Sequence, residues 1–490
     1  MINLRNYIGA VIVLAAIPIL PVLAENAQTP PNILVVFTDD VGWGDPGCYN
    51  PKSKIPTPNI DQLAKEGMRF THAHSPAALC SPTRYSMLSG NYPFRGRLAA
   101  GTWGFNCKSQ FRSGQEAVGT MLQESGYRTA MFGKAGTGGF WQKKGATSEK
   151  TLAPDEWGFD YSYLLPKGHQ SAPLAYFENG RQVADDTPWN AADVGERLLG
   201  KAIGFIDDHQ RQHSGKPFFI HFCTDGAHSP YVPATTLAGL PLKGVTKMTD
   251  HTDMVHETDL LLGALVKALD ERGLRQNTLI VYTSDNGGIP YERDMGHDAV
   301  AGLRGKKGYI FEGGHRVPFI ASWPEHIPAG SVRTQVIGTH DIIATALDLA
   351  GATVPESQCL DAVSLLPVLL DRRGDDQPLR TNLLVQSSPG RGPEDDAGFK
   401  ANGPVGRLKD KGSGPIGFAL FHGDWKLIIS KNEPCALYDL KNDLGEERDL
   451  INDPAQAERV SGMLAEYLAI RKSPRGTPPL KTGTWGNKSK

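Results

Sequence analysis

Short apolar runs separated by helical patterns constrain the fold of this chain more than any other feature. Four runs have the length and β-branched content of buried parallel strands, and they are residues 32–37 (NILVVF), 127–132 (YRTAMF), 218–222 (FFIHF) and 278–283 (TLIVYT). Between them, residues 60–64 and 261–269 carry helical apolar faces that end at Gly67 and Gly273. Strands that alternate with helices predict a doubly wound α/β fold, with a large, mixed or mostly parallel central sheet flanked by helices.

Composition excludes several classes of protein. The 490 residues include 51 Lys and Arg against 53 Asp and Glu, so the bulk charge favours neither nucleic acid nor a membrane surface as a partner. Six cysteines are too few for a fold built on disulfides. We therefore expect a globular chain that attracts an anionic ligand through local charges. Its oligomeric state does not follow from the sequence.

The first 24 residues have the features of a secretory signal peptide. Arg5 precedes an apolar stretch at residues 7–20, and residues 22–24 (VLA) offer a small-residue cleavage site. The alternative is an uncleaved membrane anchor, but Pro18 and Pro21 break an apolar run that is already short for a membrane span. The sequence predicts export to the periplasm or secretion, with no membrane contact beyond the signal peptide.

A second structural unit is predicted after the main domain at residues 30–375. In residues 376–470, a strand pattern at 423–429 is followed by a hairpin partner at 436–440 and by a helical pattern. These patterns predict a smaller C-terminal α+β subdomain with an antiparallel sheet. The tail at residues 471–490 has six basic and no acidic residues and three prolines, and we expect it to be disordered.

Acidic and amide side chains follow two of the predicted strands. Asp39 and Asp40 come after the first run, and Asp285 and Asn286 come after the run at 278–283. In open α/β sheets the loops beyond the carboxyl ends of the strands converge on one crevice. Either pair alone is typical of a turn. Together, three carboxylates and one amide suit Ca²⁺ or Mg²⁺ and not Zn²⁺, so the sequence predicts a metal site.

Residues 80–84 form the pentapeptide Cys-Ser-Pro-Thr-Arg, which has the pattern C-x-P-x-R. It resembles the maturation signature of the type I sulfatases, in the alkaline phosphatase superfamily. The resemblance extends from about residue 32 to about residue 454. Further motifs follow the family's order, and they are Asp39-Asp40, Lys134 after Phe132-Gly133, the His-x-Pro-Tyr turn at His228, Asp285-Asn286, the L-R-G-x-K-G run with Lys307, and W-K-L-I and L-Y-D-L in the C-terminal subdomain.

The resemblance implies an arylsulfatase-like sulfuric ester hydrolase with an alkaline phosphatase-like fold, whose catalytic domain is residues 30–375. In this family a maturation enzyme oxidises the cysteine, here Cys80, to formylglycine, and the hydrated aldehyde attacks the sulfate. The implied catalytic residues are Cys80, Arg84, Lys134, His228 and Lys307. The implied metal is one Ca²⁺, favoured over Mg²⁺, with ligands from Asp39, Asp40, the modified Cys80, Asp285 and Asn286.

The family also implies a role for each charged residue. Arg84 would stabilise the aldehyde hydrate and the metal-site carboxylates, and Lys134 would contact the sulfate. His228 and Lys307 would contact the bridging oxygen and protonate the leaving alcohol. If the L-R-G-x-K-G motif is aligned one position earlier, Lys306 takes the role given to Lys307.

One departure from the family pattern concerns turnover. The family has Gly-Lys-x-His where this chain has Gly136 in the histidine's place. That histidine belongs to the step that expels sulfate, so its absence predicts weakened turnover or an unusual substrate geometry. His169, from another loop, is the candidate to take the place of that histidine. Thr83 also replaces the commoner serine, and we interpret it as a tolerated variant.

The sequence leaves three functions open. The leading one is hydrolysis of a sulfate ester, with a sulfated carbohydrate or another sulfated small molecule as substrate. The alternatives are phosphodiester or phosphonate monoester hydrolysis in the same superfamily, and a catalytically weakened binder of sulfated glycans. The segments 103–112 and 386–415 are expected to shape the leaving-group pocket. Trp103, Phe105 and Trp141 are candidates for stacking on a sugar or for core positions.

Overall fold

The computed structural model describes residues 30–98, 101, 103, 107–140, 153–168, 176–183, 190–389 and 416–473. The predicted signal peptide, Phe105, Trp141, His169 and most of the 386–415 segment therefore lie outside the described residues. Within the described ranges, no helix is both long enough and apolar enough to cross a membrane.

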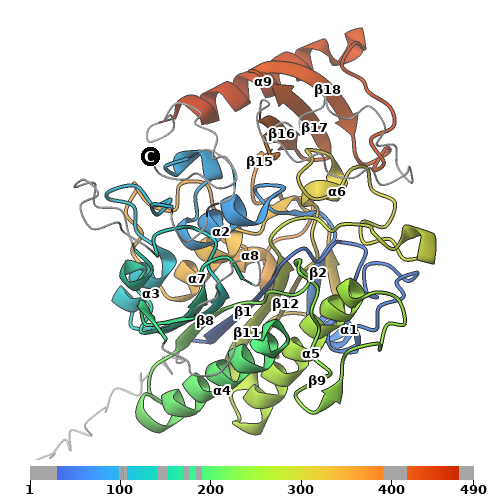
Figure 1. Cartoon of the computed structure of the whole chain (residues 1–490). Coiled ribbons are helices and arrows are strands. Elements are labelled where there is room, and N and C mark those ends of the chain that lie inside the picture. The colour runs from blue at the N-terminus through green and yellow to red at the C-terminus, as the bar shows by residue number, and fades with distance from the viewer. Residues whose placement is uncertain are drawn as a thin grey trace, which may run out of the picture.

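A large mixed sheet forms the centre of the main domain (Figure 1). In the described residues its ten strands lie in the order β13 (Ser331–Arg333), β2 (Met68–Phe70), β12 (Phe319–Ser322), β11 (Thr278–Ser284), β1 (Asn32–Thr38), β8 (Phe218–Cys223), β4 (Arg128–Lys134), β5 (Tyr161–Leu165), β6 (Phe177–Glu178) and β7 (Arg181–Gln182). The central strands β11, β1, β8, β4 and β5 are parallel, whereas β12 and β6 are antiparallel to their neighbours. The four apolar runs are therefore central strands, which confirms the predicted fold class.

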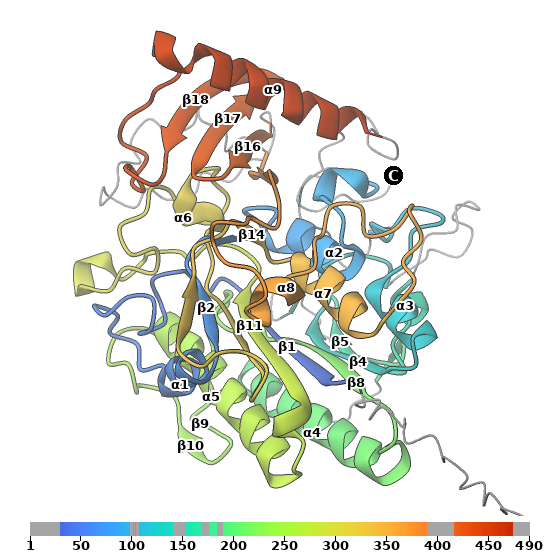
Figure 2. The same ribbon diagram turned by 180° about the vertical axis from the view of Figure 1, so that it is seen from behind.

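Helices cover both faces of this sheet (Figures 1 and 2). One face packs against α1 (Pro58–Glu66), α4 (Val194–Gln212) and α5 (Asp250–Glu271), and the other against α2 (Cys80–Ser89), α3 (Val118–Glu124), α7 (Asp341–Leu349) and α8 (Leu366–Leu369). In β1, Leu34 and Val36 belong to the first core, and Ile33, Val35 and Phe37 belong to the second. Because successive side chains of a strand point to opposite faces, burial on both faces requires a continuous apolar run.

The C-terminal unit is a separate antiparallel sheet covered by one long helix (Figure 2). Its elements are β15 (Leu383–Gln386), β16 (Gly417–His422), β17 (Trp425–Ser430), β18 (Glu433–Asp439) and α9 (Ala457–Lys472). This confirms the smaller α+β unit. The helix extends further than the sequence suggests, because Arg471, assigned above to a disordered tail, is buried against the rings of Phe94 and Phe418.

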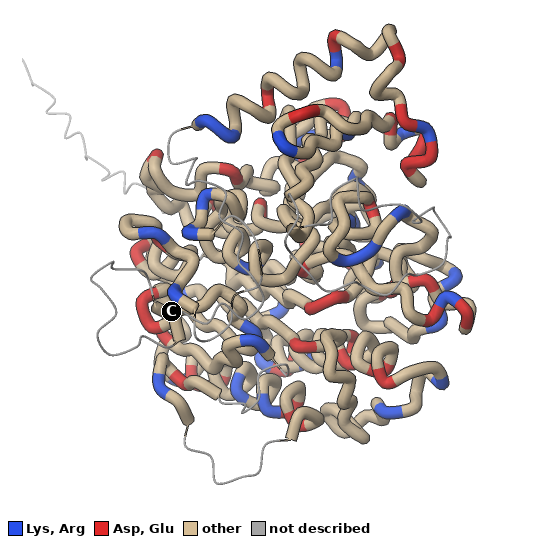
Figure 3. Tube along the Cα trace, turned by 45° about the horizontal axis from the view of Figure 1, so that its top comes forward, with Lys and Arg blue, Asp and Glu red and all other residues tan. Residues whose placement is uncertain are grey.

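Short elements complete the described chain. Two small ladders pair β3 (Ala73–His74) with β14 (Ile337–Gly338) and β9 (Thr236–Leu237) with β10 (Leu240–Pro241), and α6 spans Glu312–His315. Lysine and arginine are dispersed among aspartate and glutamate over the whole trace (Figure 3). This dispersal agrees with the near balance of charges in the sequence.

A buried ion network joins the C-terminal sheet to the main domain. Lys426 of β17 is completely buried, and its Nζ donates to Glu312 Oε1 at 2.9 Å and to Glu446 Oε1 at 2.7 Å. The other oxygen of Glu312 accepts from Arg316 Nε at 2.6 Å. Glu312 begins α6, and Gly314 in the same helix accepts a hydrogen bond from Gly287, the residue after Asn286. The C-terminal unit therefore supports a segment that contacts the predicted metal loop.

We expect Lys426→Met to destabilise the protein strongly. The change leaves two carboxylates, Glu312 and Glu446, buried without the ammonium that they share, and the loss of one partner of a buried ion pair costs about 3–5 kcal/mol. Urea unfolding of both proteins measures the difference in the free energy of unfolding. Lys267→Met is the control, because Lys267 is an exposed lysine paired with Glu271, and it should unfold like the wild type. Equal stability of all three proteins would contradict the interpretation.

Candidate active site

Neighbouring parallel strands deliver the predicted polar residues to one edge of the sheet. β1 lies between β8 and β11, and the register pairs Thr38 with Ser284. Asp39 and Asp285, each the next residue along its strand, therefore emerge side by side. Lys134 ends β4, on the far side of β8, at the same edge.

The structure brings the five predicted metal ligands together. Asn286 Nδ2 donates to Asp40 Oδ1 at 2.8 Å, and the backbone N–H of Asp40 donates to Asp285 Oδ1 at 3.3 Å. Asp39, Cys80 and Asp285 each place one potential ligand atom within 4.8 Å of the other two. All these side chains are buried.

The donor atoms of this cluster fit a hard cation. Asp39 Oδ1 and Asn286 Oδ1 are buried, and neither has a hydrogen-bond partner in the described part of the chain. Buried oxygen atoms without a partner are costly unless a ligand satisfies them. Carboxylate and amide oxygens are the ligands that Ca²⁺ and Mg²⁺ prefer, so the residues present match the expected type of metal.

Arg84 braces the carboxylates from the helix that begins at Cys80. Its Nε and Nη2 donate to Asp285 Oδ2 at 3.0 and 2.7 Å, and its Nη1 donates to the carbonyl of Lys134 at 2.9 Å. Burial and repulsion by Asp39 raise the pKa of Asp285 to about 7, although Arg84 opposes this shift. The guanidinium therefore positions the cluster and offsets part of the repulsion between carboxylates.

Two lysine ammonium groups lie against the aspartates that follow β1. Lys134 Nζ bonds to Asp39, and Lys307 Nζ lies 2.5 Å from Asp40 Oδ1. Burial alone would raise the pKa of Asp39, but Lys134 and further cations hold it well below its usual value. The ammonium of Lys307, one of the two adjacent lysines at 306 and 307, thus lies within this cluster of carboxylates.

His228 occupies the outer side of the cluster. Its Nε2 lies 3.9 Å from Asp40 Oδ2, and its Nδ1 lies 2.7 Å from the carbonyl oxygen of Ser229. Because a carbonyl only accepts, Nδ1 carries a hydrogen and Nε2 faces the site. Burial, together with Lys307 and Lys134, lowers the pKa of His228 to about 3. The side chain nevertheless keeps 12% of its surface exposed, whereas Lys134 keeps 2%.

Cys80 is the first residue of α2, and every residue of this helix is buried. The amino-terminal end of a helix favours a negatively charged group, because its N–H groups and dipole point toward that group. The Sγ atom lies 4.0 Å from Ser81 Oγ. Thr83 uses its hydroxyl to donate to the carbonyl of Ala77 at 3.0 Å, which serine also can do, and this accounts for the threonine variant.

Gly136 has a backbone reason for lacking a side chain. Its φ is +68°, in the left-handed region, and a Cβ atom here would lie 2.9 Å from Arg84 Cδ. A histidine at this position would therefore strain the backbone and displace the arginine that braces Asp285. Trp103, a candidate above for stacking on a sugar or for a core position, is 1% exposed and belongs to the core with Tyr85 and Phe111. Trp103 therefore presents no face to a substrate.

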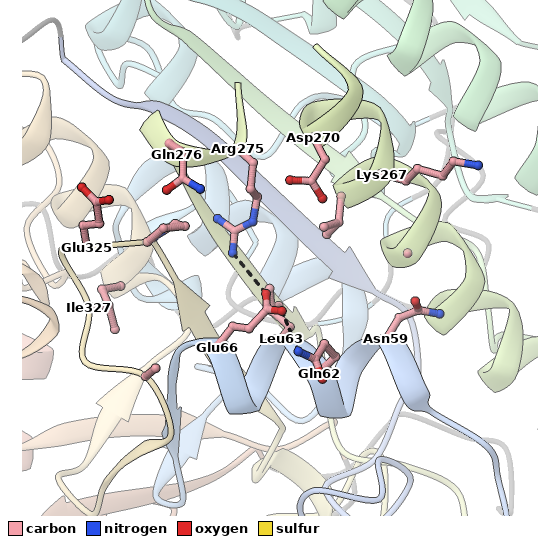
Figure 4. Close-up of a pocket in the computed structure, with 14 residues that line it drawn as sticks. Asn59, Gln62, Leu63, Glu66, Lys267, Asp270, Arg275, Gln276, Glu325 and Ile327 are labelled. Carbon is pink, nitrogen blue, oxygen red and sulfur yellow. Dashed lines mark hydrogen bonds and ion pairs between the residues drawn. The ribbon is translucent and has the colours of Figure 1, made fainter. Parts of the chain in front are cut away.

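A separate groove of about 660 Å³ lies between α1, α5 and the segment at 324–329 (Figure 4). Arg275, which points across it toward Glu66, precedes the amino-terminal end of β11. The groove is thus at the opposite end of β11 from Asp285. Its lining mixes acidic side chains, such as Asp270 and Glu325, with basic ones, such as Arg275 and Lys267, and it contains none of the predicted catalytic residues.

Known proteins resemble this chain over most of its length. The family model described as Sulfatase matches residues 31–352. Bovine (Bos taurus) arylsulfatase A is 31% identical over 91% of this chain and 88% of its own, and human (Homo sapiens) N-acetylgalactosamine-6-sulfatase is 32% identical over 73% and 69%. A solved structure from work on glycosaminoglycan metabolism by Bacteroides thetaiotaomicron has a TM-score of 0.73 and 25% identity, and it covers 90% of this chain and 99% of that chain.

The chain therefore belongs to the sulfatase family, as its sequence motifs indicate. It is a sulfuric ester hydrolase. A solved complex with k-i-k-neocarrahexaose has a TM-score of 0.72, 24% identity, and coverage of 93% of this chain and 95% of that chain, which shows the shared fold.

Proposed function

We propose that this sulfatase removes sulfate from a sulfated carbohydrate, with Cys80 modified to formylglycine and with one Ca²⁺ bound. The observation that carries the proposal is the position of Cys80, at the amino-terminal end of a buried helix and among three carboxylates and three cations. The relatives' printed names support the substrate class, since one acts on N-acetylgalactosamine-6-sulfate groups and one structural neighbour was solved with D-glucosamine-2-N,6-O-disulfate.

Asp39, Asp40, Asp285, Asn286 and the modified Cys80 would hold the cation. When bound, Ca²⁺ supplies positive charge to the sulfate oxygens, and the hydrated formylglycine supplies a nucleophilic oxygen and can later release sulfate by regenerating its aldehyde. Arg84 orients Asp285 beside the nucleophile and opposes the rise in the pKa of its carboxyl.

The remaining cations bind the sulfate and act on the leaving group. Lys134 and Lys307 add positive charge in a largely buried part of the site, where such charges act strongly on a developing anion. His228 points its Nε2 into the site, on the side where the leaving alcohol of the ester would lie. Since Nδ1 already carries a hydrogen, His228 donates a proton from Nε2 only as the imidazolium, and the negative charge of a bound sulfate ester favours that form.

The proposal is tested by an assay for released inorganic sulfate. Purified wild-type protein, produced with a formylglycine-generating enzyme, is incubated with sulfated mono- and oligosaccharides, an aryl sulfate and an aryl phosphonate. We expect sulfate release from at least one sugar. Hydrolysis of the aryl phosphonate alone would instead favour the phosphonate hydrolase alternative.

We expect Asp39→Asn to lower bound calcium and activity together, each by about tenfold or more, because the number of charged ligands sets the affinity for Ca²⁺. Metal content by mass spectrometry and activity against added Ca²⁺ measure the change. Asp45→Asn is the matched control, since Asp45 is a buried carboxyl in the same loop that pairs with His297 outside the cluster. Retention of calcium by Asp39→Asn would contradict the proposed ligand set.

We also propose that the protein is exported and cleaved after Ala24, on the basis of the signal-peptide pattern. Amino-terminal sequencing of the protein from the periplasm or the medium checks this proposal. A mature chain that begins at Met1 would contradict it.

A further inference from the structure

An aromatic cluster lies where two loops leave the catalytic edge of the sheet. Tyr231 follows His228 in the loop after β8, and Tyr291 lies in the loop after β11. The two ring centroids are 6.4 Å apart, at an angle of 72°. His251, at the start of α5, contacts both rings, with centroid distances of 4.9 and 5.7 Å. Because β8 and β11 flank β1, the two loops leave the sheet on either side of the strand that Asp39 and Asp40 follow.

Tyr291 is presented to solvent on an anchored loop. The residue is 52% exposed, but its neighbour Glu292 is buried. The Glu292 carboxylate accepts from Thr249 Oγ1 at 2.6 Å and contacts His251 Nδ1 at 3.1 Å. Single exposed apolar side chains are ordinary on protein surfaces. The Tyr291 ring, in contrast, contacts two further rings on a loop held by buried hydrogen bonds, and a ring that is already held in place loses little freedom when a ligand binds.

The cluster lies on the side of the site from which a leaving group departs. Cys80 and Lys134 are buried at the sulfate end, whereas His228 is partly exposed and the next residues, Ser229 and Pro230, are exposed. The group released from the sulfate must therefore extend past His228. The loop that carries His228 continues directly into Tyr231.

We propose that Tyr291, supported by Tyr231 and His251, is a stacking surface for the sugar ring that is released from the sulfate. The inference rests on the proposed function, and it assigns this cluster to the part of the substrate site that binds the sugar. One face of a pyranose ring presents mainly C–H groups, which pack on a flat aromatic face, while the sugar hydroxyls stay in contact with water or the tyrosine hydroxyl. An aliphatic side chain of similar size offers no such flat face.

We expect Tyr291→Ala to raise the KM for a sulfated sugar about tenfold and to change kcat little, because stacking contributes to binding and not to the chemical step. Tyr291→Phe keeps the ring and should behave like the wild type, whereas Tyr291→Leu should resemble the alanine variant. Leu240→Ala is the control, since Leu240 is equally exposed, at 52%, but lies in the β9–β10 hairpin outside the cluster. Thermal unfolding shows whether each variant is folded.

Inhibition by inorganic sulfate separates stacking from a structural effect. Sulfate occupies the enclosed end of the site, so its inhibition constant should be the same in Tyr291→Ala and in the wild type. An unchanged KM in Tyr291→Ala, a wild-type KM in Tyr291→Leu, or an equal rise in both constants overturns the stacking role. Absence of sulfate release by wild-type protein from every sugar tested would instead overturn the proposed function, which is a separate outcome.

Discussion

Replacing Cys80 by alanine should abolish sulfate release while the fold is retained. The Cys80 side chain is the precursor of the proposed nucleophile. Cys80 is also the first residue of α2, and the burial of the other residues of this helix keeps the helix in place when the thiol is removed. In the matured wild-type protein, the peptide that contains residue 80 should have a mass about 18 Da below that of the same peptide with an unmodified cysteine, because the thiol is replaced by an aldehyde. Peptide mass spectrometry and the sulfate assay measure the two effects.

The control for this prediction is Cys48→Ala. Cys48 is a partly buried cysteine in the loop after β1, and it is a free thiol like Cys80 in the structure. The wild-type peptide that contains Cys48 should have the mass of an unmodified cysteine. The Cys48→Ala variant should keep most of the activity. Full activity of Cys80→Ala would remove Cys80 from the mechanism, whatever the mass at this position.

His228→Ala should lower kcat by roughly 10²–10⁴-fold on a sugar sulfate, with a smaller effect on substrate affinity. This is the usual size of a lost acid–base contribution. The effect should be much smaller on a nitrophenyl sulfate, because a phenolate leaves readily without a proton. Values of kcat and KM for both substrates, in the wild type and the variant, measure the difference. His422→Ala, in the exposed pair with Glu466, is the control.

Equal losses of kcat on the two substrates would contradict the acid role. His228 would then be a residue that positions the sulfate without donating a proton to the leaving group. A different outcome would favour the weakened binder over the enzyme. In that case the wild-type protein releases no sulfate, and His228→Ala loses affinity for a sulfated glycan.

The turnover step is the point at which the structure changes the interpretation of the sequence. The sequence alone predicts that the missing histidine at Gly136 weakens turnover, and it suggests a simple restoration by Gly136→His. The left-handed backbone at Gly136 and the nearby Arg84 side chain make that variant a disruptive one. Its failure would therefore not show that a histidine is unnecessary.

The sequence by itself determined the central strands, the fold class and the residues of the candidate site. It could do so because strands buried on both faces require continuous apolar runs, and because the polar residues that follow such strands meet at one edge of the sheet. The order of the motifs along the chain added the family. These are local signals, and a single chain carries them without information about its tertiary contacts.

Only the tertiary structure decided which side chains meet across long separations in sequence. Lys426 contacts Glu312 inside the molecule, Arg471 is buried instead of lying in a disordered tail, and Trp103 is a core residue. The cluster of Tyr231 and Tyr291 has no periodic signal in the sequence, because loops are shaped by the contacts of their particular residues and not by a repeating pattern. Such contacts depend on how the loops after β8 and β11 approach each other, and that arrangement exists only in the assembled domain.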